Sequence, residues 1–171
     1  MGQDLMRVMA STYGDRDLVW SVKDTFIRYI GSLPDGTLTP LNGAEPFSTA
    51  GGPEWRFPYV GQSADDDELT LRYQGELRIS GHNGMLLVIL MDPWLTFTAT
   101  ETQLSVVELM SWPDTSVREV IATGPACSDG YMDAAGQGFP LGLTATAVEL
   151  FNNVYAAGTP LGPARLVPPV V

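Results

Sequence analysis

The segment ELTLRYQGELRIS, residues 68–80, restricts the fold of this chain more than any other. Apolar and polar side chains alternate along it, and this two-residue period places them on opposite faces of a half-buried antiparallel strand. Gly75 interrupts the alternation and predicts a bulge or a sharp bend. The apolar positions of the pattern are Leu69, Leu71, Tyr73, Leu77 and Ile79.

Further strand signals lie on both sides of this segment. The turn GHNG at residues 81–84 leads into MLLVILM, residues 85–91, which we expect to be a strand buried on both faces. Residues 124–140 are rich in Gly, Ala, Asp and Pro and predict a long loop. The other expected strands are residues 94–99, 102–110 and 116–123, an edge strand within residues 54–61 that is broken by Pro58, and short strands near Thr37 and Phe47.

Two helices are expected. DLVWSVKDTFIRYIG, residues 17–31, begins with the candidate N-cap Asp17 and ends at Gly31. LTATAVELFNNVYAAG, residues 143–158, predicts a second, short helix. The apolar stripes of the two helices are Val19, Val22, Phe26, Tyr29 and Ile30, and Val148, Phe151 and Tyr155.

The order of these elements favours a mainly β fold. A helix is followed by many antiparallel strands and a short helix, without the strand–helix alternation of a parallel sheet. We therefore expect an antiparallel β-sandwich-like domain with two short helices. Residues 1–16 are expected to be a loose leader, residues 17–165 a single domain and residues 166–171 an extended tail.

Composition excludes several classes of function. A formal net charge of −11 argues against binding to nucleic acid phosphates or to an anionic membrane. The single cysteine, Cys127, leaves no intramolecular disulfide and no Cys-rich zinc site. The first 16 residues lack the apolar core of a signal peptide, and the apolar run at residues 85–91 is too short to cross a bilayer. We therefore expect a cytoplasmic protein that does not insert into membranes.

His82 is the only histidine, so it is the side chain whose ordinary pKa lies nearest to neutral pH. Such a residue can ligate or orient a metal, although a histidine in a glycine-flanked turn is more often structural or simply exposed. Taken alone, Tyr29 on an apolar helix face is more often a core residue, and Tyr155 a core or surface residue. A Ser-His-Asp triad is formally open, but no local pattern supports one.

Three motifs change this interpretation because they occur together and in order. They are LVWSVKDTFIRYI at residues 18–30, GELRISGHNGMLLVILMDP at residues 75–93, and ELFNNVYAAGTPLGP at residues 149–163. The set resembles the HtaA-type haem-binding domain of actinobacterial haem uptake. With the strands between the motifs, the resemblance covers roughly residues 17–165.

The resemblance implies a role for each of three residues. Tyr29 would be the axial ligand of a ferric haem (haem b), His82 would support that tyrosine through a hydrogen bond, and Tyr155 would line the pocket. A phenolate is a known protein ligand of haem iron and, as a hard anion, favours Fe(III). The first helix, including Phe26, and the apolar strand at residues 85–91 are expected to form walls around the porphyrin. Candidate cations for the haem propionates are Lys23, Arg28, Arg72 and Arg78.

The main functional hypothesis is therefore a binding protein that holds ferric haem for transfer, storage or buffering. A haem donor or acceptor protein would be its partner. Two alternatives remain open. One is an enzyme on the same fold, either haem-dependent or acting on another small molecule. The other is a partner-binding module without haem. Members of the family are typically exported or attached to the cell envelope, in contrast to the cytoplasmic location expected from the first 16 residues.

Overall fold

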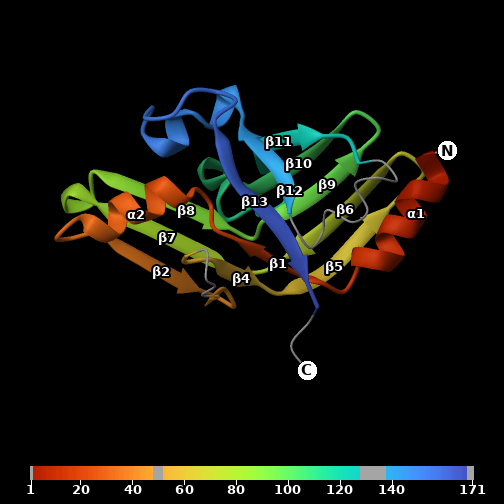
Figure 1. Cartoon of the computed structure of the whole chain (residues 1–171), viewed down its shortest axis with the longest axis horizontal. Helices are drawn as coiled ribbons and strands as arrows, with labels where there is room; N and C mark the ends of the chain where they lie inside the picture. Colours follow the sequence, from red (N-terminus) through yellow and green to blue (C-terminus); the bar gives the residue numbers. More distant parts are fainter. Residues whose placement is uncertain (1, 48–51, 128–137, 169–171) are drawn as a thin grey trace.

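The computed structural model describes residues 2–47, 52–127 and 138–168. Their strands form two antiparallel sheets, a ten-stranded sheet in the order β3-β4-β1-β13-β12-β11-β10-β9-β6-β5 and a three-stranded sheet in the order β2-β7-β8 (Figure 1). The fold is mainly antiparallel β, which confirms the predicted class.

The bounds of the elements are as follows. The strands are β1 Asp17–Trp20, β2 Thr37–Leu41, β3 Glu45–Pro46, β4 Trp55–Phe57, β5 Tyr59–Ala64, β6 Glu68–Tyr73, β7 Glu76–Gly81, β8 Leu86–Met91, β9 Trp94–Thr98, β10 Glu101–Val107, β11 Arg118–Pro125, β12 Phe139–Leu143 and β13 Pro160–Val167. The α-helices are α1 Gly2–Tyr13 and α2 Asp24–Ser32, and the short 3-10 turns are η1 His82–Gly84, η2 Leu109–Ser111, η4 Ala145–Ala147 and η5 Glu149–Phe151.

The predicted bend at Gly75 is the junction between the two sheets. The chain leaves the large sheet at the end of β6 and enters the small sheet with β7. Gly75 has a φ of 134°, which favours glycine, and a Cβ at this position would lie 2.7 Å from the backbone nitrogen of Ala44. The return from β8 to β9 passes the same point, where Asp92 N donates to Gly75 O at 2.7 Å and Gly75 N donates to Asp92 Oδ1 at 3.0 Å. The two hydrogen bonds thus join the two connections between the sheets, β6 to β7 and β8 to β9.

The helix predicted for residues 17–31 is wrong over its first half. Residues 17–20 form β1, which is buried along its whole length because it pairs with β13 on one side and β4 on the other. Asp17 is not a helix cap, since its carboxylate accepts hydrogen bonds from Arg56 Nε at 2.7 Å and Tyr59 N at 2.8 Å. Val22 has a φ of 63° and separates β1 from α2, and Gly31 lies inside that helix.

The second predicted helix, at residues 143–158, is also wrong in type. The segment forms the two turns η4 and η5. Asn152 and Asn153 both have left-handed backbone conformations, with φ of 57° and 59°, and these end the helical geometry. Phe151 is nevertheless fully buried, and Val148 packs against the core as the apolar stripe predicts.

The N-terminal segment is not a loose leader over its described part. α1 lies against β5 and β6 at one end of the large sheet (Figure 1). Met6, Met9 and Tyr13 share one face of this helix and are buried in the core. At the other terminus, the expected tail begins inside β13, which runs to Val167. Residues 128–137 of the expected long loop lie outside the described residues.

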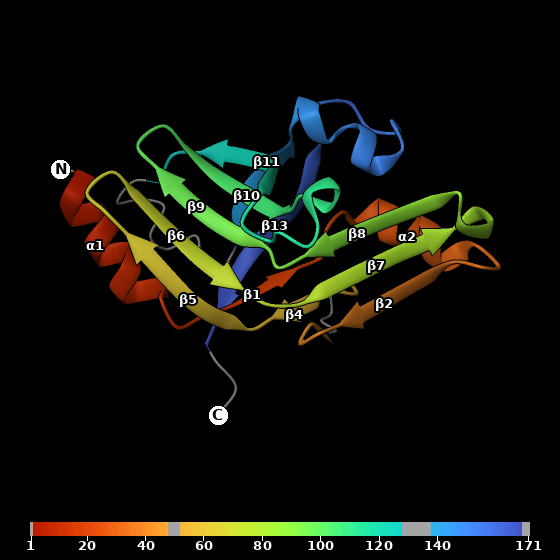
Figure 2. The same cartoon turned by 180° about the vertical axis from the view of Figure 1, so that it is seen from behind.

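β8 is buried on one face, not on both as its sequence suggests. Leu86, Val88 and Leu90 are buried, whereas Leu87 is 52% exposed. The reason is that α2 covers one face of the small sheet, through contacts with β2 and β7. Figure 2 shows the small sheet from the other side. In the part of the chain that the structure describes, no helix is long and apolar enough to cross a membrane.

Candidate functional site

Tyr29 and His82 meet at one end of the small sheet. Tyr29 belongs to α2, and His82 begins the turn η1 between β7 and β8. Although the two residues are 53 positions apart, Tyr29 Oη and His82 Nε2 share a hydrogen bond of 2.6 Å. The tyrosine is 46% exposed, so its hydroxyl group lies at the protein surface and not in the core. Which partner donates the proton depends on the imidazole tautomer.

Close packing of the turn against α2 brings the two side chains together. Gly81 lies at the end of β7, where a Cβ would come within 2.7 Å of Leu33 Cδ1, just beyond the end of α2. The end of β7 therefore packs against the residue that follows α2. The next three residues all have left-handed backbones, with φ of 51° at His82, 58° at Asn83 and 83° at Gly84.

An open cavity of about 470 Å³ lies beside the Tyr29–His82 pair. Its volume falls within the range of about 300–1,000 Å³ that is usual for small-molecule sites. Its walls come from α2, the start of β8 and the segment after η5, and the turns after β12 lie next to α2 and β8 in both views (Figures 1 and 2). The lining residues are Phe26, Tyr29, His82, Leu86, Asn152, Val154 and Tyr155.

Aromatic rings form the inner wall of this cavity. Phe26 is buried, and its ring lies edge-on to Phe151 and Tyr155, at centroid distances of 5.5 and 6.1 Å. Lys23 places its ammonium group 5.0 Å from the Tyr155 ring centroid and donates to Pro160 O at 3.2 Å. These contacts join α2 and the residue before it to Tyr155 and to the start of β13.

Comparison with known proteins assigns the family. The HtaA family model, described as Htaa, matches residues 15–167. The chain belongs to the HtaA family. No curated protein sequence matches the chain.

Solved structures of HtaA proteins share the fold. The N-terminal domain of HtaA from Corynebacterium glutamicum has 22% identity and a TM-score of 0.69, covering 91% of this chain and 98% of that domain. The C-terminal domain of the same HtaA has 20% identity and a TM-score of 0.66, covering 86% and 92%. The haem-binding protein HtaB from the same organism has 20% identity and a TM-score of 0.63, covering 88% and 90%.

In this HtaA-family chain, two of the four candidate cations lie on the helix that lines the cavity or just before it. Lys23 contacts Tyr155, whereas Arg28 is exposed on α2 and pairs with Asp24. The other two, Arg72 and Arg78, belong to strands β6 and β7 and do not line this cavity. Arg78 pairs with Glu76 on β7, and its side chain is 53% exposed, whereas its neighbours Leu77 and Ile79 are buried.

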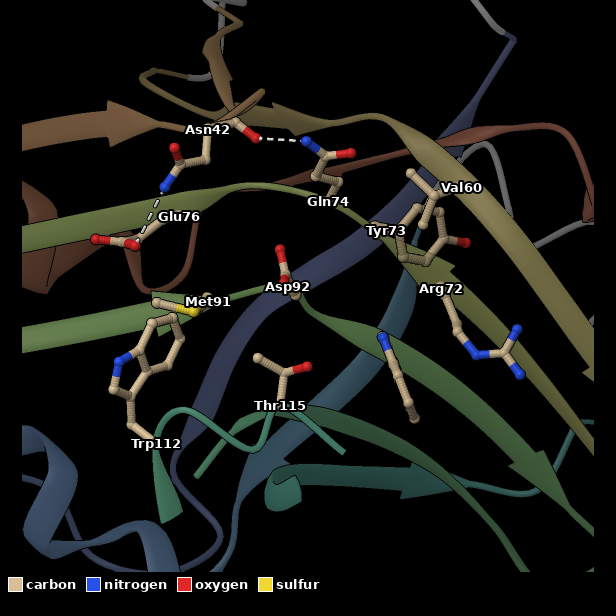
Figure 3. Close-up of a pocket in the computed structure, with 11 residues that line it drawn as sticks. Asn42, Val60, Arg72, Tyr73, Gln74, Glu76, Met91, Asp92, Trp112 and Thr115 are labelled. Carbon is tan, nitrogen blue, oxygen red and sulfur yellow. Dashed lines mark hydrogen bonds between the residues drawn. The ribbon is translucent and has the colours of Figure 1, made fainter. Parts of the chain in front are cut away.

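Arg72 lies at a second cavity, of about 540 Å³, at the junction of the two sheets (Figure 3). Its guanidinium is 5.2 Å from the centroid of Trp94, and Arg118 lies 4.0 Å from the same ring. Burial lowers the pKa of Arg118 to about 10. This cavity is the larger of the two, but it contains neither Tyr29 nor His82, so it is separate from the candidate site.

The sequence did not lead us to name three of the residues that line the cavity. Leu86 belongs to the apolar strand that was expected to form a wall, but its side of the sheet was not assigned. Asn152 and Val154 lie in a segment that was expected to be helical. The Asn152–Asn153 pair is itself a turn signal, because asparagine tolerates the left-handed conformation, and it could have revealed the break.

Proposed function

We propose that this chain binds one ferric haem in the cavity beside α2, with the Tyr29 phenolate as the axial ligand and with haem as cargo. The observation that carries the proposal is the 2.6 Å hydrogen bond between Tyr29 Oη and His82 Nε2 at the edge of an open cavity. The solved structure of the haem-binding protein HtaB has a similar fold, and this similarity supports haem as the ligand.

The residues present fit such a ligand. The described part of the chain contains no group of three or more His, Cys, Asp or Glu side chains that could hold a bare metal ion. An iron that arrives already held by a macrocycle needs one protein ligand, and phenolate is among those that haem iron accepts. Phe26, Leu86 and Val154 offer apolar contacts to a flat ring.

His82 has a defined task in this arrangement. Tyr29 must lose its proton when its oxygen binds iron, because the anionic form is the effective ligand for Fe(III). The imidazole that shares the hydrogen bond is placed to accept this proton or pass it to solvent, and an N–H on Nε2 can then donate to the phenolate oxygen. Hydrogen bonds of this kind orient a metal ligand and adjust its basicity.

Charge favours one orientation of the haem. The chain carries a formal net charge of −11, so the haem carboxylates need a local cation or solvent. Lys23 lies against Tyr155 at the inner wall of the cavity, and we propose that it is the nearest cation for a propionate. Arg28 would be a more distant contact, since its guanidinium is paired with Asp24.

The architecture favours a carrier over an enzyme. The titratable side chains that line the cavity in the described residues are Tyr29, His82 and Tyr155, with no carboxylate among them. Once His82 supports Tyr29, Tyr155 is the one titratable group among these lining residues left for acid–base chemistry on a second substrate. A half-exposed ligand also suits a protein that takes up and gives away its cargo, as transfer, storage or buffering requires.

Titration with hemin tests the proposal. Tyr29→Phe keeps the ring and removes the oxygen, so hemin binding should fall strongly and the charge-transfer absorption of phenolate-bound ferric haem should disappear. Tyr155→Phe is the matched control, because it removes a hydroxyl from another tyrosine that lines the same cavity and should keep the wild-type charge-transfer band. A Tyr29→Phe spectrum identical to the wild type would show that Tyr29 is not the ligand. Loss of the band in the Tyr155 variant instead would move the ligand to Tyr155.

A further inference from the structure

The turn that carries His82 has an unusual backbone. His82, Asn83 and Gly84 are consecutive residues with φ between 51° and 83°. Of these three, glycine adopts the left-handed region freely and asparagine tolerates it, while histidine does so rarely. A turn of this kind keeps its shape only when contacts from outside hold it. The position of the His82 ring next to Tyr29 therefore depends on what holds the turn.

Besides the Tyr29–His82 hydrogen bond, a contact to the backbone of this turn comes from Asp35. Asn83 N donates a hydrogen bond of 2.5 Å to Asp35 Oδ2. Asp35 lies in the tight connection between α2 and β2, where Gly36 N donates to Leu33 O at 3.2 Å. The same connection presses Leu33 against Gly81. One short loop thus holds the His82 turn at two points and is continuous with the helix that carries Tyr29.

We infer that Asp35 is a positioning residue for the haem site, which fixes the His82 turn so that the imidazole stays within hydrogen-bond distance of Tyr29. The inference rests on the proposed function, because its consequence is read through bound haem. Asp35 does not line the cavity, and it acts through the backbone of Asn83. A carboxylate suits this task because hydrogen bonds to a charged acceptor are stronger than those between neutral groups.

The electrostatics agree with this geometry. The pKa of Asp35 is lowered, and the hydrogen bond from Asn83 N is the main cause. Burial raises this pKa by less than that bond lowers it, and the backbone of Asp35 itself, the His82 backbone and the His82 charge lower it further. The carboxylate is therefore ionised at neutral pH, when it accepts the bond most strongly.

The test measures the rate at which hemin passes from each loaded variant to excess apo-myoglobin. Asp35→Ala should release hemin up to about 10-fold faster than the wild type, approaching the rate of His82→Ala. In the His82→Ala background, Asp35→Ala should change the rate no further, because the group it positions is already gone. Resonance Raman bands of the iron-bound phenolate should shift in the same direction in Asp35→Ala and His82→Ala.

Two further variants separate positioning from a general effect on folding. Asp114→Ala is the matched control, since Asp114 is also an exposed carboxylate that accepts a backbone N–H, from Ser116 N at 2.9 Å, in a different loop. It should keep the wild-type release rate. Asp35→Asn should release hemin more slowly than Asp35→Ala, because its amide oxygen can still accept the hydrogen bond from Asn83 N.

The failures are distinguishable. Wild-type protein that does not bind hemin would overturn the proposed function itself. Wild-type protein that binds, together with an Asp35→Ala variant that releases hemin at the wild-type rate, would overturn the role of Asp35 alone. Equal acceleration by Asp35→Ala in the presence and absence of His82, or an Asp35→Asn release rate equal to that of Asp35→Ala, would also overturn it.

Discussion

Replacing His82 by alanine removes the imidazole from the Tyr29 hydroxyl and leaves the proposed iron ligand in place. Losing a hydrogen-bond partner of a metal ligand typically weakens metal affinity by about 10- to 100-fold, which corresponds to about 1.4–2.7 kcal/mol. Tyr29 is 46% exposed, so water can replace part of the lost hydrogen bond. We therefore expect an effect at the lower end, about 10-fold, carried mainly by faster release of hemin.

The assay is hemin transfer to excess apo-myoglobin, followed by absorbance, with Met85→Ala as the control. Met85 adjoins the same turn, is 85% exposed and does not line the cavity, so its removal should leave the rate unchanged. A His82→Ala rate equal to the wild type would refute the supporting role of the hydrogen bond. Complete loss of hemin binding in His82→Ala would refute it differently, by showing that His82 is itself a ligand.

Three further predictions concern the core, the thiol and the oxidation state of iron. Phe26→Ala should lower the free energy of unfolding by about 3–5 kcal/mol in urea, because the ring is buried against Phe151; a loss below about 1 kcal/mol would contradict this packing. Burial raises the pKa of the Cys127 thiol, so its alkylation by iodoacetamide at pH 8.5 should be slower than that of free cysteine and should still accelerate above pH 9. Reduction to Fe(II) weakens the attraction between iron and phenolate, so dithionite should lower haem affinity or move ligation to His82. In His82→Ala, reduced haem should therefore dissociate. Equal affinity of that variant for ferric and ferrous haem would refute phenolate ligation.

The sheet-forming part of the fold could be predicted because its signals are local. Alternation over residues 68–80 and the break at Gly75 are visible in the sequence, and the structure places β6, β7 and their junction there. The helix α1 also had a local signal, since Met6, Met9 and Tyr13 follow helical spacing. It was missed because the segment precedes the first recognised motif.

Other features depend on partners that are distant in sequence. β1 is a strand because β4 and β13 pair with it on both sides, and a short apolar run gives no periodicity that separates a strand from a helix. Arg72 and Arg78 lie close to the His82 motif along the chain, yet they belong to different sheets. Which of the four candidate cations lies near a given cavity depends on strand pairing, which their spacing along the chain does not show.

The Tyr29–His82 pair combines a local sequence signal with a contact that depends on packing between distant segments. Tyr29 and His82 were linked by the order of the motifs, and their 2.6 Å contact follows from packing that the motifs do not describe. The end of β7 packs at Gly81 against the residue that follows α2, and the left-handed turn after it carries the imidazole that contacts Tyr29. Neither requirement is visible as chemistry in the sequence, because a glycine-flanked histidine is also what an ordinary exposed turn looks like.

The position of the cavity between parts of both sheets has a consequence for how cargo is held. The wall that carries Tyr29 and His82 belongs to the small sheet and its helix, whereas Tyr155 lies in the connection between β12 and β13 of the large sheet. A ligand that fills the cavity contacts both walls, so its binding stabilises the arrangement of the two walls. At a free ligand concentration 100 times Kd, this stabilisation is about 2.7 kcal/mol. The aromatic wall around Phe26 is buried and resists opening, whereas the His82 turn is exposed and held through Asp35. Exchange of cargo should therefore begin away from Phe26, among the exposed lining residues at the His82 turn and at Val154.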